Sequence, residues 1–263
     1  MTILKGTNIT LGYGSGPIVR EVDIEIPEQS ITIIVGPNGC GKSTLLRGLA
    51  GLLSPSAGQI SLAGMRLDSM SVRARARRLA FLPQSPIVPD GITVEELVSR
   101  GRNPHRKFLR GWTAQDERAV KGAMSETGVD GLGSRVLNEL SGGQRQRAWL
   151  ALVLAQQTEL VLLDEPTTYL DIAHQIHVLD ICRSLHETHR RTVVAVLHDL
   201  NLACRYATNI IVMNEGRVLA EGKPSEVISS RLLEDVFGIE CSITSEPISG
   251  KLHIIPHRRV GPI

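Results

Sequence analysis

A chain of 263 residues that is 42% hydrophobic can bury a sizeable core, as one large domain or two small ones. Its formal net charge of +2 gives no general attraction to nucleic acid, so no nucleic-acid partner is expected. No apolar run approaches the roughly 20 residues that span a bilayer. The first five residues also lack a signal-peptide core, so we expect a cytosolic protein. The four cysteines are Cys40, Cys182, Cys204 and Cys241. None of them has C-x-x-C spacing, which argues against a zinc site and against a disulfide framework.

The first segments of the chain alternate apolar and polar residues as half-buried β-strands do. We expect strands over residues 3–11 and 20–26, joined by a loop over residues 12–17. Residues 31–35 are all apolar except for one threonine and predict a buried strand. A helix is expected over residues 44–53.

The segment between that strand and that helix carries the P-loop pattern G-x-x-x-x-G-K-[ST]. Its glycines let successive backbone N–H groups turn inward and form a nest for phosphate oxygens, aided by the positive end of the helix. Lys42 can reach the β- and γ-phosphates of a nucleotide, and Ser43 can hold Mg²⁺. The expected phosphate-binding residues are Gly36, Pro37, Asn38, Gly39, Cys40, Gly41, Lys42, Ser43 and Thr44.

Cys40 lies inside this loop, near the Lys42 charge and the start of the helix. Both features stabilise a thiolate, so we expect a lowered pKa and a reactive thiol if the side chain faces the loop. A side chain that points into the sheet would instead be inert.

The rest of the chain alternates strands rich in Val, Ile and Leu with helices, which predicts a mostly parallel sheet covered on both faces. Residues 85–158 lack this alternation and predict a helical insertion in the α/β core. The expected strands are 59–62, 79–82, 159–163 and 192–197, and the expected helices are 93–100, 114–127, 141–156 and 172–187.

Two further motifs carry chemistry. The apolar segment 161–163 delivers Asp164 and Glu165 at the carboxyl end of a strand. Asp164 is placed to hold Mg²⁺ through water, and Glu165 to act as general base on an attacking water. In the run Leu140-Ser141-Gly142-Gly143-Gln144, the serine and glutamine have capping-box spacing, so the run opens a helix whose N–H groups suit an anion.

A P-loop, L-S-G-G-Q and an Asp-Glu pair in this order resemble the ATP-binding-cassette (ABC) ATPases. The resemblance implies an α/β fold: a P-loop NTPase core with a mostly parallel sheet, an N-terminal antiparallel β subdomain and an inserted α-helical subdomain. It implies an ATPase domain over residues 1–240, with the insertion at about 85–158 and a short extension of unknown function at 241–263. It also implies an enzyme that hydrolyses ATP with Mg²⁺.

Further site residues follow from this resemblance. Tyr13 stands where the family has the aromatic that stacks on adenine, and Gln84 where the Q-loop glutamine contacts the metal and the γ-phosphate. Asp171 resembles the D-loop aspartate, although family members often have a small residue where Tyr169 stands. His198 resembles the H-loop histidine that contacts the γ-phosphate.

The family also implies partners. Two cassettes face head to tail, so that Ser141, Gly142, Gly143 and Gln144 of one copy complete the ATP site of the other. A cassette without a membrane segment needs a separate transmembrane permease and, indirectly, a substrate-binding protein. It would lie at the cytoplasmic face of the membrane. His174 and His177 share a helix face and are expected to be surface or dimer-contact residues.

Four stretches resemble the ATPases of bacterial ferric siderophore importers, of the ferric enterobactin type: residues 100–117, 140–149, 164–175 and 197–207. Haem and cobalamin importers share parts of this pattern, and a non-transport ABC ATPase is a further alternative.

A basic stretch lies in the first of these segments. It is either a solvated face or a surface that meets the permease, in which case Arg102 and Arg106 would be exposed contacts. Its members are Arg100, Arg102, His105, Arg106, Lys107 and Arg110.

Overall fold

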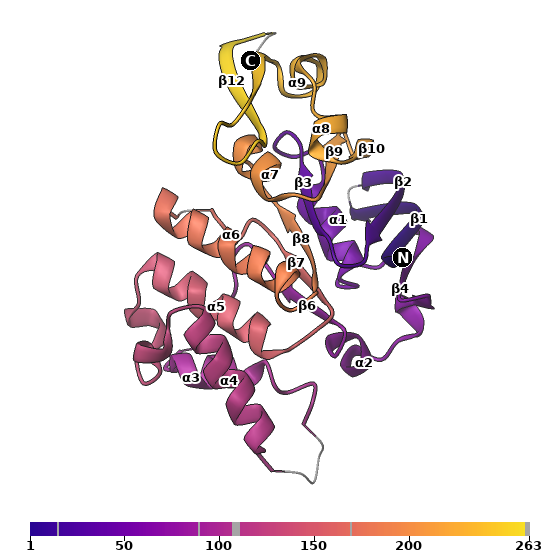
Figure 1. Ribbon diagram of the computed structural model, residues 1–263. Helices are drawn as coiled ribbons and strands as arrows, with labels where there is room; N and C mark the ends of the chain where they lie inside the picture. The colour runs from indigo at the N-terminus through magenta and orange to yellow at the C-terminus, as the bar shows by residue number, and fades with distance from the viewer. Residues whose placement is uncertain (15, 89, 107–110, 169, 261–263) are drawn as a thin grey trace. The chain divides into compact units, whose positions relative to one another are not determined.

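The residues that the computed structural model describes are 1–14, 16–88, 90–106, 111–168 and 170–260 (Figure 1). The chain divides into two units. Unit 1 comprises Met1–Ser69 and Thr192–Ile263, and unit 2 comprises Met70–Arg191. Lys107 and Arg110 of the basic stretch, and Tyr169, lie outside the described residues.

Unit 1 begins with an antiparallel sheet of order β2-β1-β4-β5. On β2, Val22, Ile24 and Ile26 are buried and their neighbours are exposed, as the alternation predicts. The predicted loop over residues 12–17 is mostly strand, because Gly12 pairs with Pro17 at the end of β1. A Cβ atom on Gly12 would lie 2.1 Å from the Gly16 carbonyl oxygen, so only glycine permits this close pairing. The strands are β1 (Thr2–Tyr13), β2 (Gly16–Pro27), β4 (Ala57–Leu62) and β5 (Met65–Arg66).

The second sheet of unit 1 has β3 (Ile31–Val35) parallel to both β8 (Thr192–Val196) and β9 (Asn209–Asn214). β10 (Arg217–Gly222) pairs antiparallel with β9. Every residue of β3 and β8 is buried, which explains why their sequences are apolar without alternation. The helix that follows β3 is α1 (Lys42–Leu49), shorter than predicted at its carboxyl end.

Unit 1 ends in a β-hairpin formed by β11 (Ile239–Ser245) and β12 (Leu252–Arg259). The side chain of Asn201, on α7 (Leu200–Tyr206), both donates to the Ile254 carbonyl at 3.1 Å and accepts from the Ile254 N–H at 2.7 Å. The hairpin is thus held against the helix that follows His198. Two short helices precede the hairpin, α8 (Pro224–Val227) and α9 (Ser230–Phe237). Elsewhere in unit 1, a 3₁₀ turn at Leu67–Ser69 follows β5.

Unit 2 contains the parallel pair β6 (Leu79–Leu82) and β7 (Leu160–Leu163). Two helices, α3 (Val94–Arg100) and α4 (Ala114–Glu126), pack against α5 (Gly142–Ala155). All three begin at capping boxes, which explains why their predicted starts are correct to within one residue.

The remaining elements of unit 2 are α6 (Ile172–Glu187), as predicted, a short α2 (Val72–Ala76), and 3₁₀ turns at Asp130–Leu132 and Leu137–Glu139. The sequence does not predict α2 because it buries no side chain and so shows no apolar period. The limits 85–158 for a helical insertion stay a prediction. None of the described helices is long and apolar enough to cross a membrane.

Candidate nucleotide-binding site

The P-loop connects β3 to α1 in unit 1, in the strand–loop–helix arrangement that the motif requires. Gly41 caps α1 with a φ of 104°, a conformation that residues with a side chain rarely adopt. A Cβ on Gly36 would lie 2.2 Å from the Met213 carbonyl oxygen, so the backbone passes close to β9. Both glycines are therefore needed for the path of the loop.

Lys42 is almost completely buried, with 5% of its surface exposed. Its ammonium group donates to the carbonyl oxygens of Gly36 and Pro37, each at 2.8 Å. The loop therefore encloses a positive charge beside the amino-terminal end of α1. Both features attract the phosphate groups of an anion.

The expectation of a reactive Cys40 is wrong. Cys40 is 5% exposed, and burial raises the pKa of its thiol more than the Lys42 charge and backbone hydrogen bonds lower it. A Cβ built on Gly36 would lie 2.8 Å from Cys40 Sγ, so the thiol packs against the backbone of the loop. All four cysteines are buried free thiols.

Tyr13 lies at the end of β1 and is 43% exposed. Its hydroxyl accepts a hydrogen bond from Arg47 Nη1 at 3.3 Å. The ring borders a cavity of about 330 Å³, whose other walls include Thr10, Pro17 and Ser56. An exposed aromatic ring on such a wall can stack on a planar ligand.

In unit 2, Asp164 and Glu165 directly follow the last residue of β7. The Asp164 side chain is fully buried, and its backbone N–H donates to Leu82 on β6 at 2.9 Å. Glu165 has a φ of 50°, an uncommon conformation for a residue with a side chain. Its Oε2 accepts hydrogen bonds from Gln84 Nε2 at 2.6 Å and from Thr168 Oγ1 at 3.0 Å.

Gln84 and Glu165 are 81 positions apart in the sequence, and the parallel pairing of β6 with β7 brings them together. The sequence indicated both residues but not this contact. Thr168 was not predicted. Its only signal is its position three residues after the glutamate, within reach in a turn.

The L-S-G-G-Q run opens α5 as predicted. Ser141 Oγ accepts from the Gln144 N–H at 3.3 Å, and Gln144 Oε1 accepts from the Ser141 N–H at 3.1 Å. Asp171 caps α6 and accepts from the His174 N–H at 2.9 Å. The hydrogen bonds from the backbone and side chain of His174 hold the pKa of the Asp171 carboxyl below its usual value. His198 follows β8 and is exposed.

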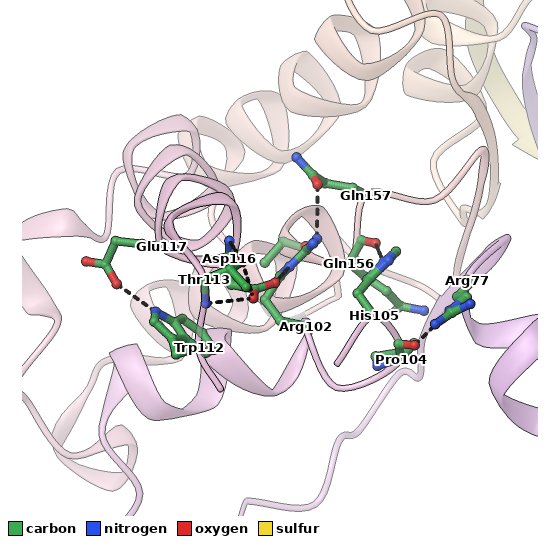
Figure 2. A network of polar contacts seen from close by, with 11 residues as sticks. Arg77, Arg102, Pro104, His105, Trp112, Thr113, Asp116, Glu117, Gln156 and Gln157 are labelled. Atoms are coloured by element: carbon green, nitrogen blue, oxygen red, sulfur yellow. Dashed lines mark hydrogen bonds and ion pairs between the residues drawn. The ribbon is translucent and has the colours of Figure 1, made fainter. Parts of the chain in front are cut away.

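The basic stretch is not a uniform surface, and Arg102 in particular is not exposed. Its Nε forms an ion pair with Asp116 at 2.9 Å, and its Nη1 donates to the Ala155 carbonyl at 2.7 Å and to Gln157 Oε1 at 3.0 Å (Figure 2). Only 2% of Arg102 is exposed, whereas Arg106 is exposed. Arg102 thus belongs to the interior of the helical cluster.

Other basic residues also hold this region together. The ring of His105 is within hydrogen-bonding distance of the Gln156 carbonyl, at 2.7 Å (Figure 2). Arg73, on α2, and Arg77, directly after α2, donate through Nε to the Pro104 carbonyl at 3.0 and 2.8 Å. Spacing in the sequence cannot distinguish these structural cations from surface ones.

Comparisons with known proteins agree with this geometry. The family model described as ABC transporter matches residues 19–168. The chain is 50% identical to "Petrobactin import ATP-binding protein FpuD" of Bacillus anthracis, over 97% of this chain and 93% of the relative. It is 46% identical to "Ferric enterobactin transport ATP-binding protein FepC" of Escherichia coli (strain K12), over 98% of this chain and 96% of the relative.

A solved structure is also similar: the dimeric post-hydrolysis state of the ATP-binding cassette MJ0796 bound to ADP and Pi. Its TM-score is 0.75 at 27% identity, with 84% of this chain and 98% of that chain covered. The α/β fold of an ABC ATPase, with a mixed sheet and an antiparallel β part, is therefore confirmed.

Proposed function

The chain belongs to the ABC transporter family and is an ATP-binding ATPase, and we propose that it powers the import of a ferric siderophore across the cytoplasmic membrane. The assignment of the cargo rests on the similarity, over almost the whole length of each chain, to relatives named for petrobactin import and ferric enterobactin transport. Haem or cobalamin import would use the same ATP chemistry with another cargo.

The P-loop is proposed to bind the phosphates of ATP. Backbone N–H groups at residues 38–44 and the buried Lys42 charge would face the phosphate oxygens. Tyr13 would stack on adenine, since its exposed ring borders a cavity.

Mg²⁺ is proposed as the cofactor, held by Ser43 and Asp164 with Gln84 as a further contact. Hydroxyl, carboxylate and carboxamide oxygens are the hard ligands that this cation prefers. The Asp164 carboxylate is fully buried, where a divalent cation would balance its charge. When bound, the cation would neutralise charge on the phosphates.

Glu165 is proposed as the general base. It would take a proton from water as the water oxygen bonds to the γ-phosphorus and the bond from that phosphorus to the ADP oxygen breaks. Gln84 and Thr168 orient its carboxylate through their hydrogen bonds. His198 and Asp171 are proposed to contact the γ-phosphate and the dimer interface, respectively.

The working form is proposed to be a head-to-tail dimer, in which residues 141–144 of one copy complete the ATP site of the other. The capped start of α5 supports this role, because it presents backbone N–H groups at the positive end of a helix. The other proposed partners are transmembrane permease subunits and, through them, a substrate-binding protein. The dimer would therefore lie on the cytoplasmic face of the membrane.

The cargo can be tested in the native host after deletion of the gene for this chain. We expect the deletion to abolish uptake of a radiolabelled ferric siderophore, and the wild-type chain to restore it. Lys42→Ala should not restore it, because this variant lacks the cation of the phosphate loop. Loss of haem or cobalamin uptake with unchanged siderophore uptake would assign the other cargo.

A further inference from the structure

One histidine outside the predicted site connects two of its motifs within unit 2. His174 lies on the first turn of α6, and its Nδ1 is 2.7 Å from Asp171 Oδ1. The same carboxylate oxygen accepts the backbone N–H of His174 at 2.9 Å. Because a carboxylate accepts, the ring donates through Nδ1–H, and this bond fixes the orientation of the imidazole.

The opposite edge of this ring lies against Gly143, the second glycine of L-S-G-G-Q. A Cβ on Gly143 would meet His174 Cδ2 at 3.1 Å and Nε2 at 3.3 Å, closer than most side-chain contacts. A Cβ on the neighbouring Gly142 would meet nothing within 4 Å.

The backbone of Gly143 does not itself require glycine. Gly143 lies within α5, and it is not among the glycines whose φ is positive. The imidazole of His174 occupies the space beside it, so a methyl group at this position would require the ring to shift by a few tenths of an ångström. The sequence gives no indication of this contact, since 31 positions separate the two residues.

We propose that His174 is a positioning residue that holds the L-S-G-G-Q turn at a set distance from the Asp171 cap of the same chain. The inference rests on the proposed dimer, in which both motifs face the second copy. His174 would touch neither ATP nor water. It would act by presenting Asp171 and the start of α5 as one preformed surface, so that closure of the dimer requires less ordering.

The proposal makes a specific prediction for ATP-driven dimer formation. In a Glu165→Gln background, which slows hydrolysis, the ATP concentration at half-maximal dimer formation can be measured by light scattering. We expect His174→Ala and His174→Leu to raise this midpoint about three- to tenfold, the size of one lost hydrogen bond. His174→Asn should stay near the parent, because its amide can donate to Asp171 from the position of Nδ1.

Two controls separate positioning from damage to the fold or to the P-loop. Glu187→Ala changes an exposed residue at the other end of α6, outside the motifs proposed to face the second copy, and should leave the midpoint unchanged. Binding of a fluorescent ATP analogue to the monomer should be unchanged in every His174 variant, since His174 is proposed to touch neither the P-loop nor ATP. Thermal unfolding midpoints equal to that of the parent chain would verify that each variant is folded.

A double-mutant cycle tests the contact with Gly143 directly. Gly143→Ala should raise the midpoint, and adding His174→Ala should reverse part of that increase, because the smaller side chain makes room for the new methyl group. Gly142→Ala, which meets no neighbour, should not be rescued by His174→Ala. The proposal would be overturned if the double variant raised the midpoint by the product of the two single-variant factors. It would also be overturned if His174→Leu had the midpoint of the Glu165→Gln parent.

The failure of the inference can be told from that of the proposed function. If the Glu165→Gln parent formed no dimer at any ATP concentration, the proposed dimer and this inference would both be wrong. A parent that dimerises normally, with His174→Ala unchanged, would overturn the inference alone.

Discussion

The Glu165 carboxylate depends on side chains from two places in the sequence. Gln84, two residues after β6, and Thr168, in the turn after β7, both donate to Oε2. The residue types in the sequence indicated the acid and the glutamine, but the hydrogen bond between them depends on which strands pair. Local chemistry could be predicted here, whereas a contact across 81 positions could not.

Replacing Glu165 by Gln tests the proposed base. The amide cannot accept a proton at neutral pH, so we expect ATP hydrolysis to fall by about 10²- to 10⁴-fold. ATP affinity should stay near wild type, because the variant leaves the P-loop and Lys42 intact. Steady-state phosphate release and equilibrium nucleotide binding measure the two quantities. Turnover close to wild type would remove Glu165 from the role of base.

Side-chain direction is the part of the residue-scale picture that spacing leaves open. The position of Cys40 beside Lys42 suggested an activated thiol, but its side chain is buried and its pKa is raised. The prediction that Arg102 is exposed was wrong for the same reason, since the sequence places Arg102 in a run of cations without showing that its side chain is buried. Burial depends on tertiary packing, which neither composition nor spacing contains.

Among the elements of unit 2, the three helices α3, α4 and α5 are joined by one buried arginine, Arg102, through an ion pair and a hydrogen bond. Arg102 follows α3, Asp116 belongs to the capping box of α4, and the Ala155 carbonyl is at the end of α5. A cation at the carboxyl end of α5 also complements its helix dipole. The capping boxes made the starts of these helices predictable, but not the ion pair that connects them.

Two arginines of the same stretch provide a matched comparison. Arg102→Glu places a second negative charge beside Asp116 in a buried site and should destabilise the chain by about 3 kcal/mol or more. Arg106→Glu changes an exposed residue and should have an effect within about 0.5 kcal/mol. Thermal unfolding of the two variants provides the comparison. Equal unfolding midpoints would contradict the buried role of Arg102.

The ion pair also predicts a pH dependence. The side-chain hydrogen bond from Thr113, followed by that from Arg102, holds the pKa of the Asp116 carboxyl below its usual value despite burial. A lowered folded pKa stabilises the protein above the unfolded pKa of about 4, and this contribution is lost as the pH falls through the folded value. The difference in unfolding midpoint between wild type and Asp116→Asn should be constant near neutral pH and shrink below about pH 4. A difference in unfolding midpoint that grows on acidification would contradict a lowered pKa for the Asp116 carboxyl.

For the molecule as a whole, the order of the motifs along the chain allowed the α/β fold and the N-terminal antiparallel sheet to be predicted. Mostly apolar strands without alternation, such as β3 and β8, indicated a parallel sheet before any pairing was known. The carboxyl-terminal hairpin was not predicted in detail, because its strands have mixed burial and its contacts with α7, which include the hydrogen bonds of Asn201, join residues far apart in the sequence. Weak local patterns of this kind leave little for a sequence-based prediction to detect.

The most direct test of the central claim is a mixture of two inactive variants. Lys42→Ala disables the P-loop, and Ser141→Arg obstructs the start of α5, so neither variant should hydrolyse ATP alone. In a head-to-tail dimer of the two, one site combines the intact P-loop of one chain with the intact α5 start of the other. We predict that mixing equal amounts restores up to about one quarter of wild-type ATP hydrolysis, since about half of the dimers are mixed and each has one intact site. Hydrolysis that stays at the level of the separate variants, although mixed dimers form, would contradict an ATP site completed by a second copy of the chain.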